Sequence, residues 1–171
     1  MPRYVALLRG VSPMNARMPA LKACFEAAGF SDVRTLLSSG NVAFDARASS
    51  LPTLERRAEA AMQSGLGRNF VTIVRPQAVL QALVASEPFA AFELPPSSKP
   101  LVVFLRAPME ATLDLPMHRH DASILAFNGT EALCAYVPGP NASGFMGLLE
   151  RSFGKTLTTR TLETVRKCAW A

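Results

Sequence analysis

The chain has 171 residues, of which 49% are hydrophobic and 18% are charged, and its 18 basic and 13 acidic side chains give a formal net charge of +5. This length fits one domain of ordinary size or two small ones, and the apolar content excludes a disordered, collagen-like or coiled-coil protein. Apolar runs such as Tyr4–Leu8 and Leu101–Leu105 have five residues each, whereas a membrane-spanning helix needs about 20. We therefore expect a soluble protein with no membrane contact.

The three cysteines, Cys24, Cys134 and Cys168, are far apart and never form a CxxC pair. An odd number at such spacing indicates neither a disulfide framework nor a zinc site, so we expect small core residues. Met1-Pro2-Arg3 leads directly into a strand-like run, without the apolar segment of a secretory signal. We expect a cytoplasmic protein of bacterial type.

The first half of the chain alternates between strand and helix patterns. A continuous apolar stretch at residues 3–9 predicts a central strand, and apolar residues at helical spacing after Pro19 predict a helix. The predicted elements are strands at 3–9, 33–37, 42–44 and 70–74, and helices at 18–28 and from Ser49 onward. Their order, β-α-β-β-α-β, is that of a ferredoxin-like subdomain over residues 1–75.

Residues 76–97 are predicted to connect two parts of the chain, with a helix at 77–86 followed by a proline-rich loop. Beyond this connection the pattern nearly recurs, and it predicts a second ferredoxin-like subdomain with a C-terminal helix over residues 98–171. Its predicted elements are strands at 101–106, 123–127, 132–137 and near Leu157, and helices at 109–113, 143–153 and after Thr159, which would cap the last helix. The predicted fold class is α+β, with two ferredoxin-like (βαββαβ) subdomains packed as one compact unit.

Four segments together carry a family resemblance. They are Tyr4–Val11 (YVALLRGV), Gly29–Thr35 (GFSDVRT), Ser39–Phe44 (SGNVAF) and Thr158–Val165 (TTRTLETV). In this combination the chain resembles the bacterial domain of unknown function 1697 family over essentially its whole length. The resemblance implies a fold of two ferredoxin-like α+β subdomains, and it implies no established activity, substrate or cofactor.

Five polar residues lie at predicted loop and cap positions that a binding site could use. Arg9 follows the first strand, Ser39 and Asn41 lie at a hairpin tip, and Thr159 and Arg160 lie at a predicted helix start. Unsatisfied N–H groups and the macrodipole of a helix N-terminus suit anions, as does a bidentate guanidinium. The set predicts a site for a small anionic ligand. The structural alternative is that Thr159 only caps a helix and Arg9 pairs with a carboxylate.

The segment His118-Arg119-His120-Asp121 holds both histidines of the chain. An H-x-H spacing on a strand would place two imidazoles on one face, with Asp121 as a third metal ligand. No fourth ligand suggests itself, so we interpret the segment as a solvated loop and expect no metal and no other cofactor. The sequence also lacks a G-x-S-x-G elbow, a Walker loop and a G-x-G-x-x-G fingerprint. It therefore identifies no catalytic motif.

The leading hypothesis is a soluble cytosolic protein that binds a small anionic ligand. One alternative is a nucleic-acid-binding module, because ferredoxin-like sheets serve as RNA platforms and phosphate contacts need basic residues. The basic residues are dispersed, however, with adjacent pairs at Arg56-Arg57 and Arg166-Lys167. The other alternative, an enzyme of unidentified class, predicts a deep pocket near His118 or His120. The oligomeric state stays open.

Overall fold

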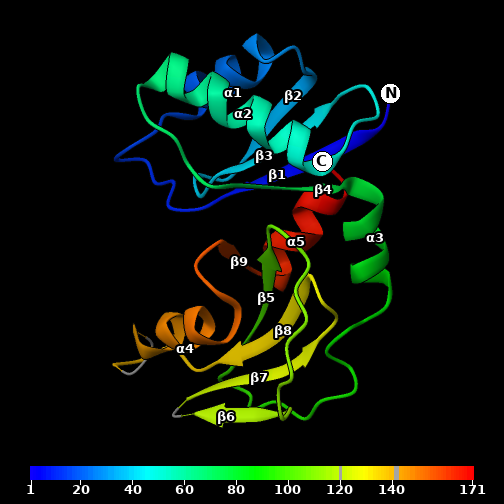
Figure 1. The fold of residues 1–171 in the computed structure, drawn as a ribbon. Coiled ribbons are helices and arrows are strands. Elements are labelled where there is room, and N and C mark those ends of the chain that lie inside the picture. The colour runs from blue at the N-terminus through cyan, green and yellow to red at the C-terminus, as the bar shows by residue number, and fades with distance from the viewer. Residues whose placement is uncertain (120, 141–142) are drawn as a thin grey trace. The chain divides into compact units, whose positions relative to one another are not determined.

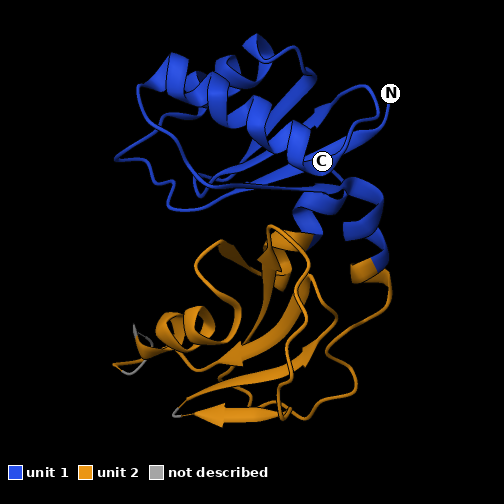
Figure 2. Ribbon diagram, in the orientation of Figure 1, with its two compact units in different colours: residues 1–82, 166–171 blue, residues 83–165 orange. Residues whose placement is uncertain are grey.

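The computed structural model describes residues 1–119, 121–140 and 143–171. The chain divides into two compact units, shown in separate colours in Figure 2: unit 1 comprises residues 1–82 and 166–171, and unit 2 comprises residues 83–165. The described residues form two antiparallel sheets and five helices, which confirms the predicted α+β class. None of these helices is both long enough and apolar enough to cross a membrane.

Unit 1 is built on a four-stranded sheet with the strand order β2-β3-β1-β4. Two helices, α1 and α2, lie against this sheet (Figure 1). Their buried residues, such as Phe25 and Leu54, belong to its apolar core. The bounds are β1 (Arg3–Leu8), α1 (Met18–Ala27), β2 (Ser31–Leu36), β3 (Asn41–Asp45), α2 (Leu51–Leu66), β4 (Thr72–Pro76) and α3 (Gln77–Ala85). The order of elements predicted for residues 1–75 is therefore found.

The strand β4 lies at the edge of this sheet, and two glutamates of α2 bind its backbone N–H groups. Glu55 Oε2 accepts a hydrogen bond from Val74 N at 2.9 Å, and Glu59 Oε2 accepts one from Thr72 N at 3.3 Å. Unpaired N–H groups of an edge strand offer a template for pairing with another chain. The glutamates of α2 remove that template at these two positions.

The last residues of the chain belong to unit 1. Gln77 Nε2 donates a hydrogen bond to the Ala171 carbonyl oxygen at 2.9 Å, and Arg3 Nε donates one to the same oxygen at 2.8 Å. These bonds tie the residues that follow α5 (Leu162–Ala169) to β1 and to the start of α3. The compact units thus have different bounds from the predicted segments 1–75, 76–97 and 98–171.

Unit 2 is built on a five-stranded sheet with the strand order β6-β7-β8-β5-β9. Helix α4 packs on this sheet (Figure 1). Its buried side chains join those of the strands in one apolar core. The bounds are β5 (Lys99–Leu105), β6 (Met117–Arg119), β7 (Ala122–Phe127), β8 (Glu131–Tyr136), α4 (Ser143–Phe153) and β9 (Leu157–Thr161). The predicted hairpin around Asn128-Gly129 and the predicted helix at 143–153 are both present.

The helix predicted at 109–113 is wrong, and unit 2 therefore lacks the βαββαβ order predicted for a second ferredoxin-like subdomain. Residues 106–116 contain neither helix nor strand, and β6, which was not predicted, follows them. Apolar side chains recur at every second position up to Met117, and Met109, Leu113 and Met117 pack against the core. A period of two is the pattern of extended chain. Met109 and Leu113 are also four residues apart, a spacing that equally fits one face of a helix.

Gly40 lies in the turn between β2 and β3, where a side chain has no room. Its φ is +88°, and a Cβ placed on it would lie 2.9 Å from both Leu8 Cβ and Val11 Cβ. We expect Gly40→Ala to lower the free energy of unfolding by about 2–4 kcal/mol, because left-handed backbone strain adds to overpacking. Urea titrations of the two proteins measure this difference.

Gly67→Ala is the matched control for Gly40→Ala. Gly67 has a φ of +70°, but no neighbouring atom lies within 4 Å of its Cβ position. Only the backbone strain of about 1–2 kcal/mol remains in that variant. Equal losses of stability in the two variants would contradict the packing argument.

All three cysteines are buried and free, as predicted for small core residues. Burial raises the pKa of the Cys134 thiol from 9.0 to about 12. The unfolded chain therefore releases a proton near pH 9 that the folded chain keeps, so stability from this group is present below pH 9 and is lost as the pH rises toward 12.

Between pH 9 and 10.5 we expect the free energy of unfolding to fall more steeply in the natural chain than in Cys134→Ala. The slopes should differ by up to about 1.4 kcal/mol per pH unit. Urea titrations at a series of pH values measure both slopes, and parallel slopes would show that Cys134 does not contribute.

Candidate functional site

The three candidate residues in unit 1 lie around the turn between β2 and β3 and the end of β1. Asn41 is completely buried, and its Nδ2 donates hydrogen bonds to the Leu36 carbonyl oxygen and to Ser39 Oγ, each at 3.0 Å. Arg9 is half-buried, and its backbone N donates a hydrogen bond to the Val71 carbonyl oxygen at 2.9 Å. The amide of Asn41 thus holds the turn together, and the structure brings Ser39 and Asn41 into direct contact.

The two candidate residues in unit 2 lie in strand β9, so the predicted helix start at Thr159 is wrong. Adjacent residues of a strand point to opposite faces, and Thr159 and Arg160 therefore do not face one site from β9. Arg160 is buried, and its Nη1 donates hydrogen bonds to Thr158 Oγ1 and to the Thr159 carbonyl oxygen, each at 2.7 Å. The threonines favour a strand because they are β-branched.

Thr161 takes the capping role that was predicted for Thr159. Helix α5 begins at Leu162, and Thr161 Oγ1 accepts a hydrogen bond from Thr164 N at 3.3 Å. Arg9, Ser39 and Asn41 belong to unit 1, and Thr159 and Arg160 belong to unit 2. An anion site that uses all five stays a prediction.

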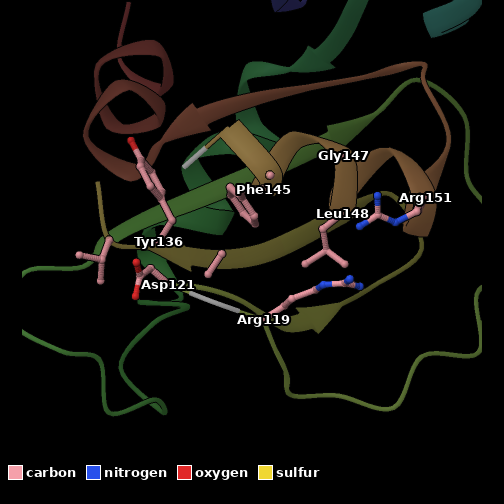
Figure 3. Close-up of a pocket in the computed structure, with 10 residues that line it drawn as sticks. Arg119, Asp121, Tyr136, Phe145, Gly147, Leu148 and Arg151 are labelled. Atoms are coloured by element: carbon pink, nitrogen blue, oxygen red, sulfur yellow. The ribbon is translucent and has the colours of Figure 1, made fainter. Parts of the chain in front are cut away.

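A hollow of about 250 Å³ within unit 2 combines arginine side chains with an aromatic wall (Figure 3). We call it the arginine pocket. It lies between α4 and the adjoining ends of β6, β7 and β8. Its lining residues are Arg119, Asp121, Ala122, Tyr136, Val137, Gly144, Phe145, Gly147, Leu148 and Arg151.

Strand register brings Arg119 to this pocket. Arg119 pairs with Ala122 across β6 and β7, and Ala122 pairs with Tyr136 across β7 and β8. Directly paired residues share a face of the sheet, and Ala122 belongs to the core formed with α4. Arg119 and Tyr136 therefore both face α4, as Figure 3 shows.

Two glycines of α4 leave room on the helix side of the pocket. Among the described residues, apart from its chain neighbours and the backbone of its own helix, no atom lies within 4 Å of a Cβ position on Gly144, whereas the Cβ position of Gly147 lies 3.4 Å from Arg151 Nη1. The Arg151 side chain thus folds back over the preceding turn of its own helix. Its guanidinium lies on the same side of the pocket as that of Arg119 (Figure 3).

Apolar side chains form the rest of the wall. The rings of Tyr136 and Phe145 stack with centroids 5.8 Å apart and an interplanar angle of 23°, and Leu148 is buried beside them. Asp121, the acidic residue that lines the pocket, points away from both guanidinium groups in Figure 3. The two arginines are exposed, and neither makes an ion pair or a hydrogen bond with a side chain in the described part of the chain.

A second hollow, of about 370 Å³, involves His118 and Ser123. His118 pairs with Ser123 across β6 and β7, and the His118 Nδ1 to Ser123 Oγ distance is 2.7 Å. Within residues 1–119, 121–140 and 143–171, no carboxylate binds the imidazole and no group of three or more metal-ligating side chains occurs. A catalytic triad needs such an orienting carboxylate. The other histidine, His120, lies outside the described residues.

Sequence reasoning missed Arg119, Tyr136 and Arg151 as site residues. A signal for Arg119 exists, because it continues the every-second-residue pattern that runs from Met109 to Met117 and so shares the face that packs on the core. Tyr136 and Arg151 reach the pocket from β8 and α4. Residues this far apart in the sequence line one pocket only in the folded chain, so no local sequence pattern predicts that they come together.

Comparisons with known proteins agree with the fold and name no activity. The sequence profile of a family described as "Protein of unknown function (DUF1697)" matches residues 1–129. A conserved bacterial protein, SP0830 from Streptococcus pneumoniae, has a similar solved structure with a TM-score of 0.69 and 17% sequence identity, covering 99% of this chain and 97% of that chain. At this identity the likeness shows the fold alone. No curated protein matches the chain.

The position of the α5 cap can be tested with a matched pair of variants. Thr161→Val removes the hydroxyl that accepts the Thr164 N–H and keeps the β-branched shape, so we expect it to lower the free energy of unfolding by about 1 kcal/mol. Thr159→Val makes the same chemical change at a strand position and should leave stability within about 0.5 kcal/mol. Urea titrations measure the free energy of unfolding of both variants. A larger loss of stability in Thr159→Val than in Thr161→Val would show that Thr159 is the cap.

Proposed function

The chain belongs to the DUF1697 family. Because that family is one of unknown function, we propose a function from the residues of this chain: unit 2 binds a small ligand that carries a phosphate or carboxylate group, with Arg119 and Arg151 as its anion contacts. One observation carries the proposal. Two guanidinium groups from different elements face one hollow, and neither has a carboxylate partner in the described part of the chain.

The chemistry of guanidinium supports an anionic ligand. Its planar, permanently charged fork of donors matches carboxylate and phosphate oxygens, and such charge-assisted hydrogen bonds are stronger than neutral ones. Two like charges on one side of a hollow repel each other, and an anion between them removes that repulsion. The site therefore favours the bound state electrostatically.

A structural role explains these arginines less well. A basic residue in the last turn of a helix interacts favourably with the macrodipole, and Arg151 lies in the last turn of α4. Its Nη1, however, lies beside Gly147, one turn back toward the N-terminus. The guanidinium is thus directed away from the helix end where the dipole would hold it.

The proposed ligand class is the one predicted from the sequence, whereas the contact residues are new. A cytoplasmic location is part of the proposal, supported by three free cysteines, since reducing compartments keep thiols free. We also propose that unit 1 is ferredoxin-like. Its β-α-β-β-α-β order and its strand order β2-β3-β1-β4 support that assignment.

Titration with inorganic phosphate at low ionic strength tests the anion site. We expect phosphate to shift the backbone amide NMR signals of Gly144 and Gly147, because both line the arginine pocket. Arg119→Gln and Arg151→Gln should each raise the Kd for phosphate about tenfold, since each removes one charge-assisted contact of about 1.4 kcal/mol.

Arg166→Gln is the matched control, because Arg166 is exposed, belongs to unit 1 and undergoes the same loss of charge. Its Kd for phosphate should equal that of the natural chain. If all three variants bind phosphate equally weakly, the loss of affinity reflects only the change in net charge, and this result would overturn the proposed site. A short single-stranded oligonucleotide in the same titration tests the nucleic-acid alternative, which predicts weakening by Arg166→Gln as well.

A further inference from the structure

A smaller hollow of about 170 Å³ lies beside the arginine pocket within unit 2. We call it the side hollow. It shares two lining residues, Tyr136 and Phe145, with the arginine pocket. Its lining residues are Leu101, Tyr136, Phe145, Met146, Leu149 and Thr159. The two hollows thus adjoin at one stacked pair of rings.

The chemistry of the side hollow differs from that of the arginine pocket. None of the described residues that line it is charged, and their polar atoms are the phenol of Tyr136, the hydroxyl of Thr159 and the backbone. Leu101 and Leu149 are buried in its wall, whereas Met146 is 37% exposed at its edge. Such a hollow suits an apolar group, because moving apolar surface out of water lowers the free energy. A polar group would lose its hydration there, which is unfavourable.

We propose that the ligand of the arginine pocket is amphiphilic: its anionic head group contacts Arg119 and Arg151, and a short alkyl or aryl substituent passes the rings of Tyr136 and Phe145 into the side hollow. This inference rests on the proposed function. The side hollow is smaller than the roughly 300–1,000 Å³ of sites for drug-sized ligands. Its volume therefore suits a chain of a few carbons.

The exposed Met146 supports the same ligand. An unbranched thioether side chain adapts its shape to irregular apolar surfaces and is common at binding surfaces that accept different partners. At the edge of the side hollow it can close over a chain that enters. Thr159 lies on the opposite wall, on the strand β9. A larger residue at position 159 would fill the hollow without touching the guanidinium groups.

Alkyl phosphates that share one head group test the inference. Methyl phosphate and butyl phosphate differ by three methylene groups, each of which raises affinity by about fourfold when it leaves water. We expect butyl phosphate to bind the natural chain at least tenfold more tightly than methyl phosphate, measured by calorimetric titration. In Thr159→Met this ratio should fall to about one.

Two further variants complete the design. Thr112→Met makes the same change at an exposed position of unit 2 and should keep the tenfold ratio. Met146→Ala removes a wall of the side hollow at its exposed edge, so a folded protein is expected, and the ratio should fall by about half or more. This second variant tests the inference even where Thr159→Met fails to fold.

The outcomes separate this inference from the proposed function. A ratio near one in the natural chain, with methyl phosphate still bound through Arg119 and Arg151, would overturn the amphiphilic ligand and leave the anion site in place. An unchanged ratio in both Thr159→Met and Met146→Ala would place the chain outside the side hollow and overturn the inference too. Failure of both phosphates to bind would overturn the anion site itself.

Discussion

Side-chain alternation along the short strands β6, β7 and β8 is the constraint on which the candidate site depends. Consecutive strand residues point to opposite faces of a sheet, so His118 and Arg119 serve different surfaces. Arg119 pairs with Ala122, and Ala122 pairs with Tyr136. This register places the Arg119 guanidinium and the Tyr136 phenol on the face of the sheet that α4 covers. A register shift of one residue would exchange the two faces and place the imidazole under the helix instead.

Helix α4 leaves space for the arginine pocket because two of its residues are glycines without side chains. Gly144 and Gly147 open the helix surface beside the pocket, and each glycine costs a helix roughly 0.5–1 kcal/mol relative to alanine. Phe145, Leu148 and Leu149 offset that cost by packing into the core of unit 2. Packing against the described side chains gives no reason to keep both glycines, because a methyl group on Gly144 would meet none of them within 4 Å. The space they leave serves the Arg151 side chain and the hollow.

Local patterns were enough to predict unit 1 and were not enough for unit 2. In unit 1 each element carries its own signal, such as the apolar stretch of β1 and the turn at Gly40, so the order of elements followed from the sequence. In unit 2 the segment that ends at Met117 has apolar residues at every second position, which fits a strand, and also at a spacing of four, which fits a helix, so its local pattern does not decide between the two. The arginine pocket could not be predicted from local patterns, because β6, β8 and α4 contribute its residues and these elements come together only in the tertiary fold.

Two of the five residues predicted from the sequence to bind an anion are buried in the structure. Asn41 and Arg160 are polar and adjacent to turns or helix starts in the sequence, but both are buried and their donors are bonded to nearby backbone and hydroxyl oxygens. Such groups stabilise the chain that surrounds them, since a buried donor without a partner costs about 1–3 kcal/mol. Arg119 and Arg151 differ because their charges face a hollow and no described carboxylate neutralises them. A ligand is recognised by donors that the fold has left available, and in the described part of this chain the arginine pocket brings two such guanidinium groups together.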